Sequence, residues 1–227
     1  MKQIPLAILP EAAPSFDSFI VGPNAAALQH LRNLQDVAAP VYLWGPSGSG
    51  KTHLLSALAA ERQAAGERVG WFGSRSEAPW PVDEGWSLAV LDDCQDYDVQ
   101  QQQAAFGVFV EAVSSGVQVV AAGRVPPVDL PVRDDLRTRL GWGHVFALQP
   151  LAEEQARAAL RREADRRGIF LSDDVMDYLL TRFARDLKHL MRLLDRLDAF
   201  ALSHQRGVTV PLLKSMLAEE GAAGAPT

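Results

Sequence analysis

The sequence predicts an α/β protein with a five-stranded parallel sheet flanked by helices, followed by a small all-helical domain. Short apolar runs alternate with longer amphipathic segments up to about residue 150, a pattern typical of a parallel sheet with helices on both faces. Beyond Pro150 the strand-like runs stop and only helical periodicity continues. A glycine-rich loop between the first apolar run and the next helix adds a phosphate-binding motif to this fold.

Five short apolar runs predict the strands, and they cover residues 41–44, 69–72, 88–91, 117–122 and 145–148. One helix is expected after Asn24, with Leu28, Leu31 and Leu34 on one stripe. Further helices are expected over residues 51–65 and 99–115, and Gly66 is placed to end the first of these. The all-helical part is expected to contain helices at residues 152–167, 173–182, 187–205 and 211–219.

Four segments follow from this pattern. Residues 1–15 hold three prolines and no helical period, which predicts an extended tail. Residues 16–150 form the predicted nucleotide-binding α/β domain, and residues 151–220 form the helical domain. Residues 221–227 are small side chains only, and we expect them to be a disordered tail.

The composition favours a cytoplasmic protein without a membrane partner. The net charge is −6 and the pI about 5.4, whereas sequence-independent DNA binding needs clustered cations. Any contact with DNA is therefore expected to be indirect. No apolar stretch approaches the ~20 residues of a membrane span, and the N-terminus lacks a signal-peptide pattern. The single cysteine, Cys94, excludes an intrachain disulfide and is expected to be a buried thiol.

Residues 45–52 match the complete Walker A pattern, and they are Gly45, Pro46, Ser47, Gly48, Ser49, Gly50, Lys51 and Thr52. Glycines let backbone N–H groups converge on phosphate oxygens, and the helix that follows points the positive end of its dipole at the same anion. Lys51 is expected to reach the β- and γ-phosphates, and Thr52 to hold Mg²⁺. A chance glycine loop is the alternative, and the position between strand and helix argues against it.

The apolar run at residues 88–91 ends in two acidic residues, which is typical of the second half of such a site. Asp92 is expected to bind Mg²⁺ through water, and Asp93 is placed to orient or activate the attacking water. Adjacent carboxylates repel each other unless a cation lies between them, so a helix-capping role for both is the weaker interpretation.

Four segments in the right order resemble the DnaA family of AAA+ ATPases. They are residues 16–24, 50–55, 92–95 and 136–143, and the resemblance extends from about residue 14 to 220. It implies a P-loop AAA+ domain with a helical lid that binds ATP or ADP with Mg²⁺. It also implies that Phe19, Val21 and His53 lie near the nucleotide.

The segment 136–143 is similar to the family segment that carries the arginine finger, and the resemblance places the finger at Arg139. Arg137 is the competitor, but residues two apart on a helix do not share a face, so only one is expected to enter a neighbour's site. An arginine inserted in trans beside the γ-phosphate neutralises developing charge. The other interpretation of each is a surface arginine, and we favour it for Arg137.

Two segments depart from the family pattern. The family usually has a polar residue near the end of the strand at 117–122, where this chain has Ala122 and Gly123. We therefore expect the chain's own ATPase to be weak. The family usually has arginine at the position of Lys188, which keeps the charge and loses the bidentate fork. Lys188 is expected to contact a phosphate, with a solvated surface lysine as the alternative.

The N-terminal tail resembles a sliding-clamp-binding peptide. Its residues are Gln3, Ile4, Pro5, Leu6 and Ile8, with Gln expected at the pocket rim and the apolar side chains in a cleft. The chain also ends at Thr227, where DnaA continues into a DNA-binding domain. The combination resembles the regulatory inactivators of DnaA, which implies two partners, DnaA and the β clamp of DNA polymerase III. A homodimer stays open.

Three other function classes fit parts of the sequence. A nucleotide-stabilised adaptor would only recruit partners and would keep working without Arg139. A AAA+ loader would hydrolyse ATP rapidly as a stable ring. A small P-loop metabolite kinase would need an acceptor pocket and an arginine lid, and the helical domain argues against it.

Five arginines also form a stripe on one expected helix: Arg157, Arg161, Arg162, Arg166 and Arg167. A solvated face with local ion pairs is favoured over a contact with DNA or DnaA.

Overall fold

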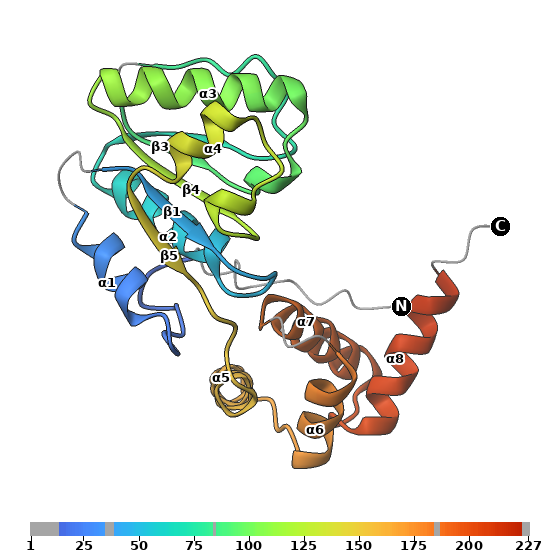
Figure 1. The fold of residues 1–227 in the computed structure, drawn as a ribbon. Helices are drawn as coiled ribbons and strands as arrows, with labels where there is room; N and C mark the ends of the chain where they lie inside the picture. The colour runs from blue at the N-terminus through green and yellow to red at the C-terminus, as the bar shows by residue number, and fades with distance from the viewer. Residues whose placement is uncertain (1–13, 35–38, 84, 184–186, 224–227) are drawn as a thin grey trace. The chain divides into compact units, whose positions relative to one another are not determined.

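A computed structural model of the chain describes residues 14–34, 39–83, 85–183 and 187–223 (Figure 1). The chain divides into two compact units, one of residues Ala13–Pro150 and one that contains the residues from Leu151 onward. Each unit has buried cores of its own, so each is described by itself.

The first unit is built on a five-stranded parallel sheet, as the sequence predicts. The strands are β1 Val41–Trp44, β2 Arg68–Phe72, β3 Trp86–Leu91, β4 Gln118–Gly123 and β5 His144–Ala147. Their spatial order is β2-β3-β4-β1-β5, and every neighbouring pair is parallel. The carboxyl ends of β1, β3 and β4 therefore meet at one edge, where the loops after them can build a site.

Helices cover both faces of this sheet (Figure 1). They are α1 Ala25–Arg32, α2 Lys51–Ala64, α3 Val99–Ser114 and α4 Asp134–Leu140, with short 3₁₀ turns η1 Cys94–Asp96 and η2 Pro127–Asp129. Side chains of β1 alternate between two cores: Val41 and Leu43 pack with α1 and α2, and Tyr42 packs with α3 and α4. Burial on both faces explains why the inner strands β1, β3 and β4 are largely continuous apolar runs, whereas the edge strands β2 and β5 are partly exposed.

Local signals in the sequence fix several helix ends. Gly66 ends α2 in the left-handed conformation, with φ of +82°. At the start of α3, Asp98 accepts a hydrogen bond from the Gln101 backbone while the Gln101 side chain accepts one from the Asp98 backbone. The predicted stripe on the first helix is wrong at Leu34: α1 ends at Arg32, and Leu34 lies beyond it but still packs into the same core.

The second unit contains four helices, α5 Glu153–Arg166, α6 Asp173–Arg182, α7 Leu187–His204 and α8 Val210–Ala223. They enclose one apolar core that includes Leu160, Met176, Leu194 and Leu213. Residues 221–223, assigned to the tail from the sequence, are helical, since alanine is the strongest helix former. Among the described helices none has the length and apolarity to cross a bilayer.

The arginine stripe lies on α5 and is largely engaged in ion pairs within this unit. Arg157 pairs with Asp177 and Arg161 with Asp173, both on α6. Arg166 and Arg167 pair with Glu163, and Arg167 also pairs with Asp195 of α7. These four arginines therefore form local ion pairs, as the favoured interpretation predicts. Arg162 is exposed.

Glu163 → Gln is expected to destabilise the helical unit at neutral pH. Hydrogen bonds from Arg166 and Arg167 lower the pKa of Glu163 to about 2, although burial of the carboxylate acts in the opposite direction. An unfolded glutamate titrates near pH ~4.3, so the stabilisation is complete above about pH 5 and is lost as pH falls from ~4.3 toward 2. After discounting for solvent screening, we expect about 1–2 kcal/mol at pH 7.

Urea unfolding of the full chain at pH 7, 4 and 2.5 measures this difference. The gap in unfolding free energy between wild type and Glu163 → Gln should shrink on acidification, whereas Glu219 → Gln, at an exposed position on α8, should show no such gap. A gap that is constant with pH would contradict the prediction.

Candidate functional site

The loop between β1 and α2 has a backbone that only glycine accommodates at two key points. Gly45 has φ of +155° and Gly50 has φ of +95°. A Cβ on Gly45 would lie 2.2 Å from the Leu148 carbonyl oxygen, and one on Gly50 would lie 2.6 Å from the Phe19 ring. Gly45 is therefore required by the nearby Leu148 backbone, and Gly50 by the nearby Phe19 ring. Without side chains at these two positions, phosphate oxygens can approach the N–H groups of the loop.

Lys51 lies within this loop rather than reaching into solvent. The residue is 6% exposed, and its ammonium donates hydrogen bonds to the Gly45 oxygen at 2.8 Å and the Pro46 oxygen at 2.9 Å. Ser49 is buried beside it, and its hydroxyl lies 3.5 Å from the same ammonium. The loop and the first turn of α2 therefore hold the Lys51 ammonium in the concavity that the glycines form. A positive charge in this concavity fits the phosphate chain of a nucleotide.

Asp92 and Thr52 meet at the carboxyl end of β3. The Thr52 hydroxyl donates to Asp92 Oδ2 at 2.8 Å, and Asp92 is 5% exposed. Burial raises the pKa of Asp92 above its ordinary value, and the nearby charge of Asp93 adds to this, while the bond from Thr52 and the charge of Lys51 oppose it. A hydroxyl and a buried carboxylate side by side are hard oxygen donors, so these two residues fit a Mg²⁺ ion.

Asp93 holds a strained backbone next to this pair. Its φ of 54° and ψ of 41° are left-handed, which residues other than glycine seldom adopt, and its N–H donates to Asp92 Oδ1 at 2.9 Å. Such strain persists where surrounding contacts enforce it, and it is concentrated at functional sites. The carboxylate is partly buried and accepts a hydrogen bond from Gln95 Nε2 at 3.4 Å.

Cys94, the next residue, is completely buried, as the sequence predicts. Burial raises the pKa of this thiol to about 12. The side chain therefore packs as a small apolar group at neutral pH.

At the end of β4 there is no room for a polar side chain at position 123. A Cβ on Gly123 would lie 2.0 Å from the hydroxyl of Tyr42, which is buried and donates to the Val125 oxygen at 3.0 Å. The Gly123 oxygen also accepts a hydrogen bond from the Gly45 backbone at 3.3 Å. The tyrosine hydroxyl thus occupies the space that a polar side chain at position 123 would need.

Sequence reasoning missed Gln95, which links the two strand ends. Its amide donates to Asp93 and, at 2.7 Å, to Asp96, while its oxygen accepts from the Arg124 backbone at 2.9 Å. Arg124 pairs with Asp96 at 2.8 Å. The family-like segment 92–95 includes this glutamine but assigns it no role, and its contacts with Asp93 and Arg124 could be identified only from the structure.

The residues predicted near the nucleotide lie beside the loop to different degrees. The Phe19 and His53 rings are 5.6 Å apart, and Phe19 also packs against Gly50. His53 Nε2 lies 3.0 Å from the Ser15 oxygen. Val21 is 36% exposed and lies before α1, which begins at Ala25. Phe19 and His53 therefore form one wall next to the loop.

Arg139 and Arg137 lie on α4 and have different surroundings. Arg137 pairs with Asp134 one turn earlier on the same helix and donates to the Leu130 oxygen at 3.4 Å. Arg139 is exposed, and within the described part of the chain its guanidinium makes no hydrogen bond or ion pair. Of the two, Arg139 is the more exposed, and Arg137 is the one already held by partners on its own chain.

Two sets of predicted site residues cannot be placed against this loop. Lys188 is in α7, in the other unit, and its side chain is outside the described residues. The residues of the predicted clamp-binding tail, Gln3 to Ile8, also lie outside them.

Comparisons with known proteins match both units. A family model described as the bacterial DnaA ATPase domain matches residues 11–76, and one described as the Hda lid domain matches residues 153–217. Domain III of the replication initiation protein DnaA from Thermotoga maritima is 21% identical, with a TM-score of 0.75 over 93% of this chain and 98% of that one. AMPPCP-bound DnaA from Aquifex aeolicus is 22% identical, with a TM-score of 0.66 over 82% and 65%. The branch migration motor RuvB from Thermotoga maritima is 17% identical, with a TM-score of 0.63 over 91% and 72%.

The fold and its phosphate-binding loop define this protein as a AAA+ domain followed by a helical lid, and the match over residues 11–76 relates that domain to the bacterial DnaA ATPase domain. Such a domain implies that it binds an adenine nucleotide. The match to the lid identifies the chain more narrowly as an Hda-like protein, and that family implies regulation related to DnaA.

Proposed function

We propose that this protein regulates replication initiation by stimulating the hydrolysis of DnaA-bound ATP, with Arg139 as an arginine finger in trans. In this proposal residues 16–150 bind ATP or ADP, residues 151–220 form the lid and residues 1–15 bind the sliding clamp. One observation carries it: a phosphate-binding loop shares a domain with an exposed arginine that has no acidic partner among the described residues. An arginine in such a position can stabilise charge in a reaction centre on another molecule.

The chain's own nucleotide site has a structural role in this proposal. Thr52 and Asp92 would hold Mg²⁺, which when bound neutralises phosphate charge. In this proposal Lys51 binds the phosphates, Lys188 is a further candidate for a phosphate contact, and Phe19, Val21 and His53 border the nucleoside. Asp93 is the candidate to orient water. Since Gly123 has no side chain and the Tyr42 hydroxyl beside it is bonded to the Val125 oxygen, β4 offers no polar side chain at its end, and we expect slow intrinsic hydrolysis.

The tail brings the protein to its partner. Gln3, Ile4, Pro5, Leu6 and Ile8 follow the order of a clamp-binding peptide, in which glutamine binds the pocket rim and the apolar side chains fill the cleft. A clamp loaded on DNA then concentrates this protein near DnaA, so that DNA is contacted only through partners.

The test is single-turnover hydrolysis of radiolabelled ATP on DnaA, with and without this protein and with clamp loaded on DNA. We expect stimulation only when protein and loaded clamp are both present. The double variant Gln3 → Ala, Leu6 → Ala should lose clamp retention in a pull-down and most of the stimulation, while nucleotide affinity stays unchanged. Full stimulation by this variant would refute the role of the tail.

A second candidate, a nucleotide-stabilised adaptor that only recruits, is favoured by the apolar end of β4. The two functions differ at Arg139, because an adaptor does not need this side chain.

A further inference from the structure

The side chain of Asn24 does not cap the helix that it precedes. Asn24 is the N-cap residue of α1, where an asparagine side chain usually accepts a hydrogen bond from the first turn, but it makes no such bond. Its amide pairs instead with the backbone of Gln149, 125 positions further along the chain. Asn24 Nδ2 donates to the Gln149 oxygen at 2.9 Å, and Asn24 Oδ1 accepts from the Gln149 N–H at 2.8 Å. The asparagine therefore holds both backbone groups of one distant residue.

This Asn24–Gln149 pair depends on a buried side chain. Asn24 is 3% exposed. A buried amide without partners costs free energy, so Asn24 can lose its two hydrogen bonds to Gln149 only at a penalty. Because the amide is planar and bonds to both backbone groups, it also fixes the orientation of Gln149.

The last segment of this domain lies against both parts of the nucleotide site. The Leu148 N–H donates to the Trp44 oxygen at 2.6 Å, and the Leu148 oxygen is the atom that a Cβ on Gly45 would approach to 2.2 Å. The Asn24 N–H donates to the Val21 oxygen at 2.8 Å and so closes the turn before α1. Gly45 begins the phosphate loop, and Val21 is expected to border the nucleoside. A ligand that holds these two segments therefore also holds the chain next to Gln149.

Gln149 also stands at the start of the connection to the helical unit. The nucleotide-binding unit ends at Pro150, and α5 begins at Glu153. We call residues 149–152 the linker. Its proline has a fixed φ and no N–H group, which limits the conformations that the linker can adopt. What holds Gln149 therefore holds the first residue of a short and stiff connection.

We propose that Asn24 is a positioning residue that couples adenine-nucleotide binding to the order of the linker. This inference rests on the binding of nucleotide at residues 45–52, and it adds a regulatory connection to that site. The Asn24–Gln149 pair can be closed or open, as in any local opening of a fold. Nucleotide favours the closed state because it holds the turn at Val21 and the loop at Gly45. Such coupling is reciprocal, so the closed pair raises nucleotide affinity by the factor by which nucleotide favours the closed pair.

Hydrogen exchange of the full chain tests this coupling. It is measured with and without Mg-ADP on peptides that cover the phosphate loop, residues 45–52, and the linker. In wild type Mg-ADP should slow exchange in both segments, by about tenfold in the linker, which is within the usual range of coupling between sites. In Asn24 → Ala saturating Mg-ADP should still protect the phosphate loop, whereas the linker should show no response to the nucleotide.

A second variant keeps the test independent of the start of α1. Asn24 → Asp preserves the shape of the side chain and the strong capping preference of this position, so the helix should form as in wild type. Its carboxylate has no donor for the Gln149 oxygen, so the response of the linker should be lost as in Asn24 → Ala. By reciprocity, the dissociation constant for fluorescent mant-ADP should rise about tenfold in both variants.

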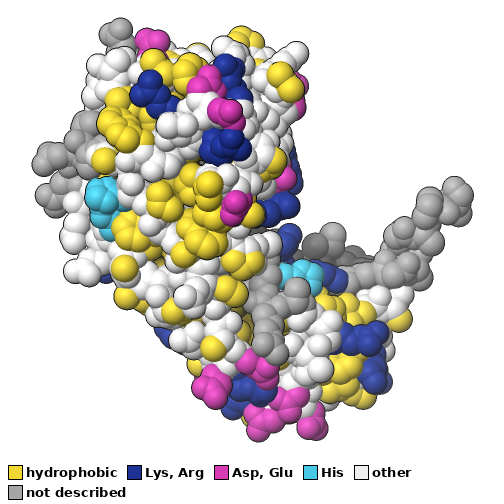
Figure 2. Space-filling view, in the orientation of Figure 1, with side chains coloured by type: hydrophobic (Ala, Val, Ile, Leu, Met, Phe, Trp, Pro, Cys, Tyr) yellow, Lys and Arg dark blue, Asp and Glu magenta, His cyan; other side chains and the backbone are white. Residues whose placement is uncertain are grey.

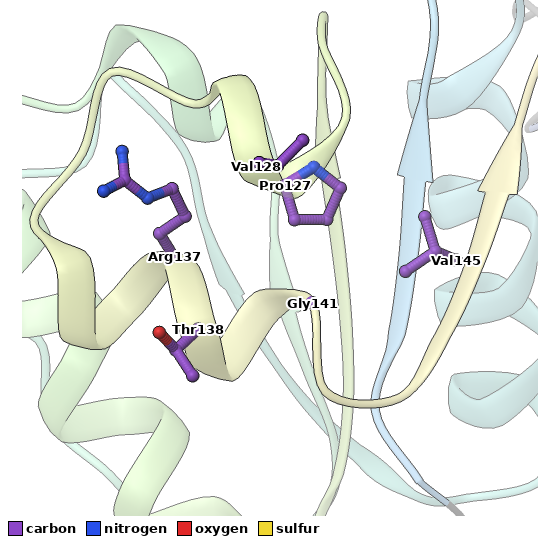
Figure 3. Close-up of a pocket in the computed structure, with 6 residues that line it drawn as sticks. All are labelled: Pro127, Val128, Arg137, Thr138, Gly141 and Val145. Carbon is purple, nitrogen blue, oxygen red and sulfur yellow. The ribbon is translucent and has the colours of Figure 1, made fainter.

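Two further variants control for lost stability and for a surface change. Gln101 → Ala removes a buried amide that donates to the Ser74 and Ser76 oxygens at 2.9 and 3.0 Å, so it should lower the melting temperature about as much as Asn24 → Ala. Figure 2 shows hydrophobic side chains at the surface among charged ones. Val128 is 75% exposed and lines the open hollow of about 430 Å³ that Figure 3 shows. Gln101 → Ala and Val128 → Ala should both keep the linker response and the affinity of wild type.

The remaining outcomes separate this inference from the site on which it rests. If Mg-ADP protects the phosphate loop but not the linker in wild type, or if the linker response persists in the Asn24 variants, the coupling is wrong and the nucleotide site survives. If Gln101 → Ala also loses the linker response, the cause is a general loss of stability, which overturns the coupling. If both Asn24 variants lose protection of the phosphate loop at saturating Mg-ADP, Asn24 belongs to the nucleotide site itself, and the coupling is again wrong. If Mg-ADP protects neither segment in wild type, the nucleotide site fails and the inference with it.

Discussion

Arg139 → Ala is expected to reduce the stimulated hydrolysis of DnaA-bound ATP about 10³-fold, and to leave this protein's clamp and nucleotide binding unchanged. The guanidinium would neutralise charge that develops on the transferred phosphoryl group, and fingers of this kind contribute roughly 10³–10⁵ in rate. In the structure the side chain is exposed on α4 and has no partner of its own among the described residues, so removing it costs the fold little. The loss should appear in the maximal rate and not in half-saturation.

Two matched variants make this result specific. Arg139 → Lys keeps the charge but loses the planar fork of donors, so it should recover only a small part of the rate. Arg137 → Ala removes an arginine of the same helix that is already paired with Asp134, and it should retain most of the stimulation. If Arg139 → Ala is as active as wild type, the adaptor function is favoured. If only Arg137 → Ala loses activity, the arginine finger is Arg137 and the assignment to Arg139 is wrong.

The fold could be predicted from the sequence because its signals are local. The five apolar runs and the glycine at position 66 are properties of short segments, and the predicted strands and helices differ from those in the structure by at most two residues at each end except at α8. The short helix α4 was not among the predicted elements. The stripe that ended at Leu34 was misleading, because a residue can pack into a core after its helix has ended. Periodicity reports burial and not the hydrogen bonds that define helix ends.

The site could be predicted only as far as its motifs extend. Walker A glycines and the pair Asp92–Asp93 follow from spacing, because phosphate and metal chemistry demand those residues in that order. The left-handed backbone of Asp93, the Tyr42 hydroxyl at Gly123 and the bridge formed by Gln95 depend on the register of neighbouring strands. Contacts between residues far apart in the chain leave no periodic trace in one sequence.

Lys51 → Ala is expected to remove nucleotide binding and to destabilise the loop itself. The ammonium donates to the Gly45 and Pro46 oxygens at 2.8 and 2.9 Å from a buried position, so alanine leaves both carbonyls without this donor. Removing one partner of a buried hydrogen bond costs about 1–3 kcal/mol. The variant should therefore melt several degrees below wild type even without nucleotide, and its affinity for ATP should fall at least about 100-fold, because the charge that faces the phosphates is gone.

Thermal unfolding with and without ATP separates the two effects. A ligand at about 100 times its dissociation constant stabilises the folded state by ~2.7 kcal/mol, which corresponds to roughly 5–10 °C in a chain of this size. Wild type should show that increase, and Lys51 → Ala should show none at the same ATP concentration. Lys214 → Ala removes a lysine that lies over the Tyr178 ring in the helical unit, so it should respond to ATP like wild type. A Lys51 → Ala protein that still gains stability from ATP would contradict the phosphate-loop assignment, because that assignment makes this ammonium the main charge that faces the triphosphate.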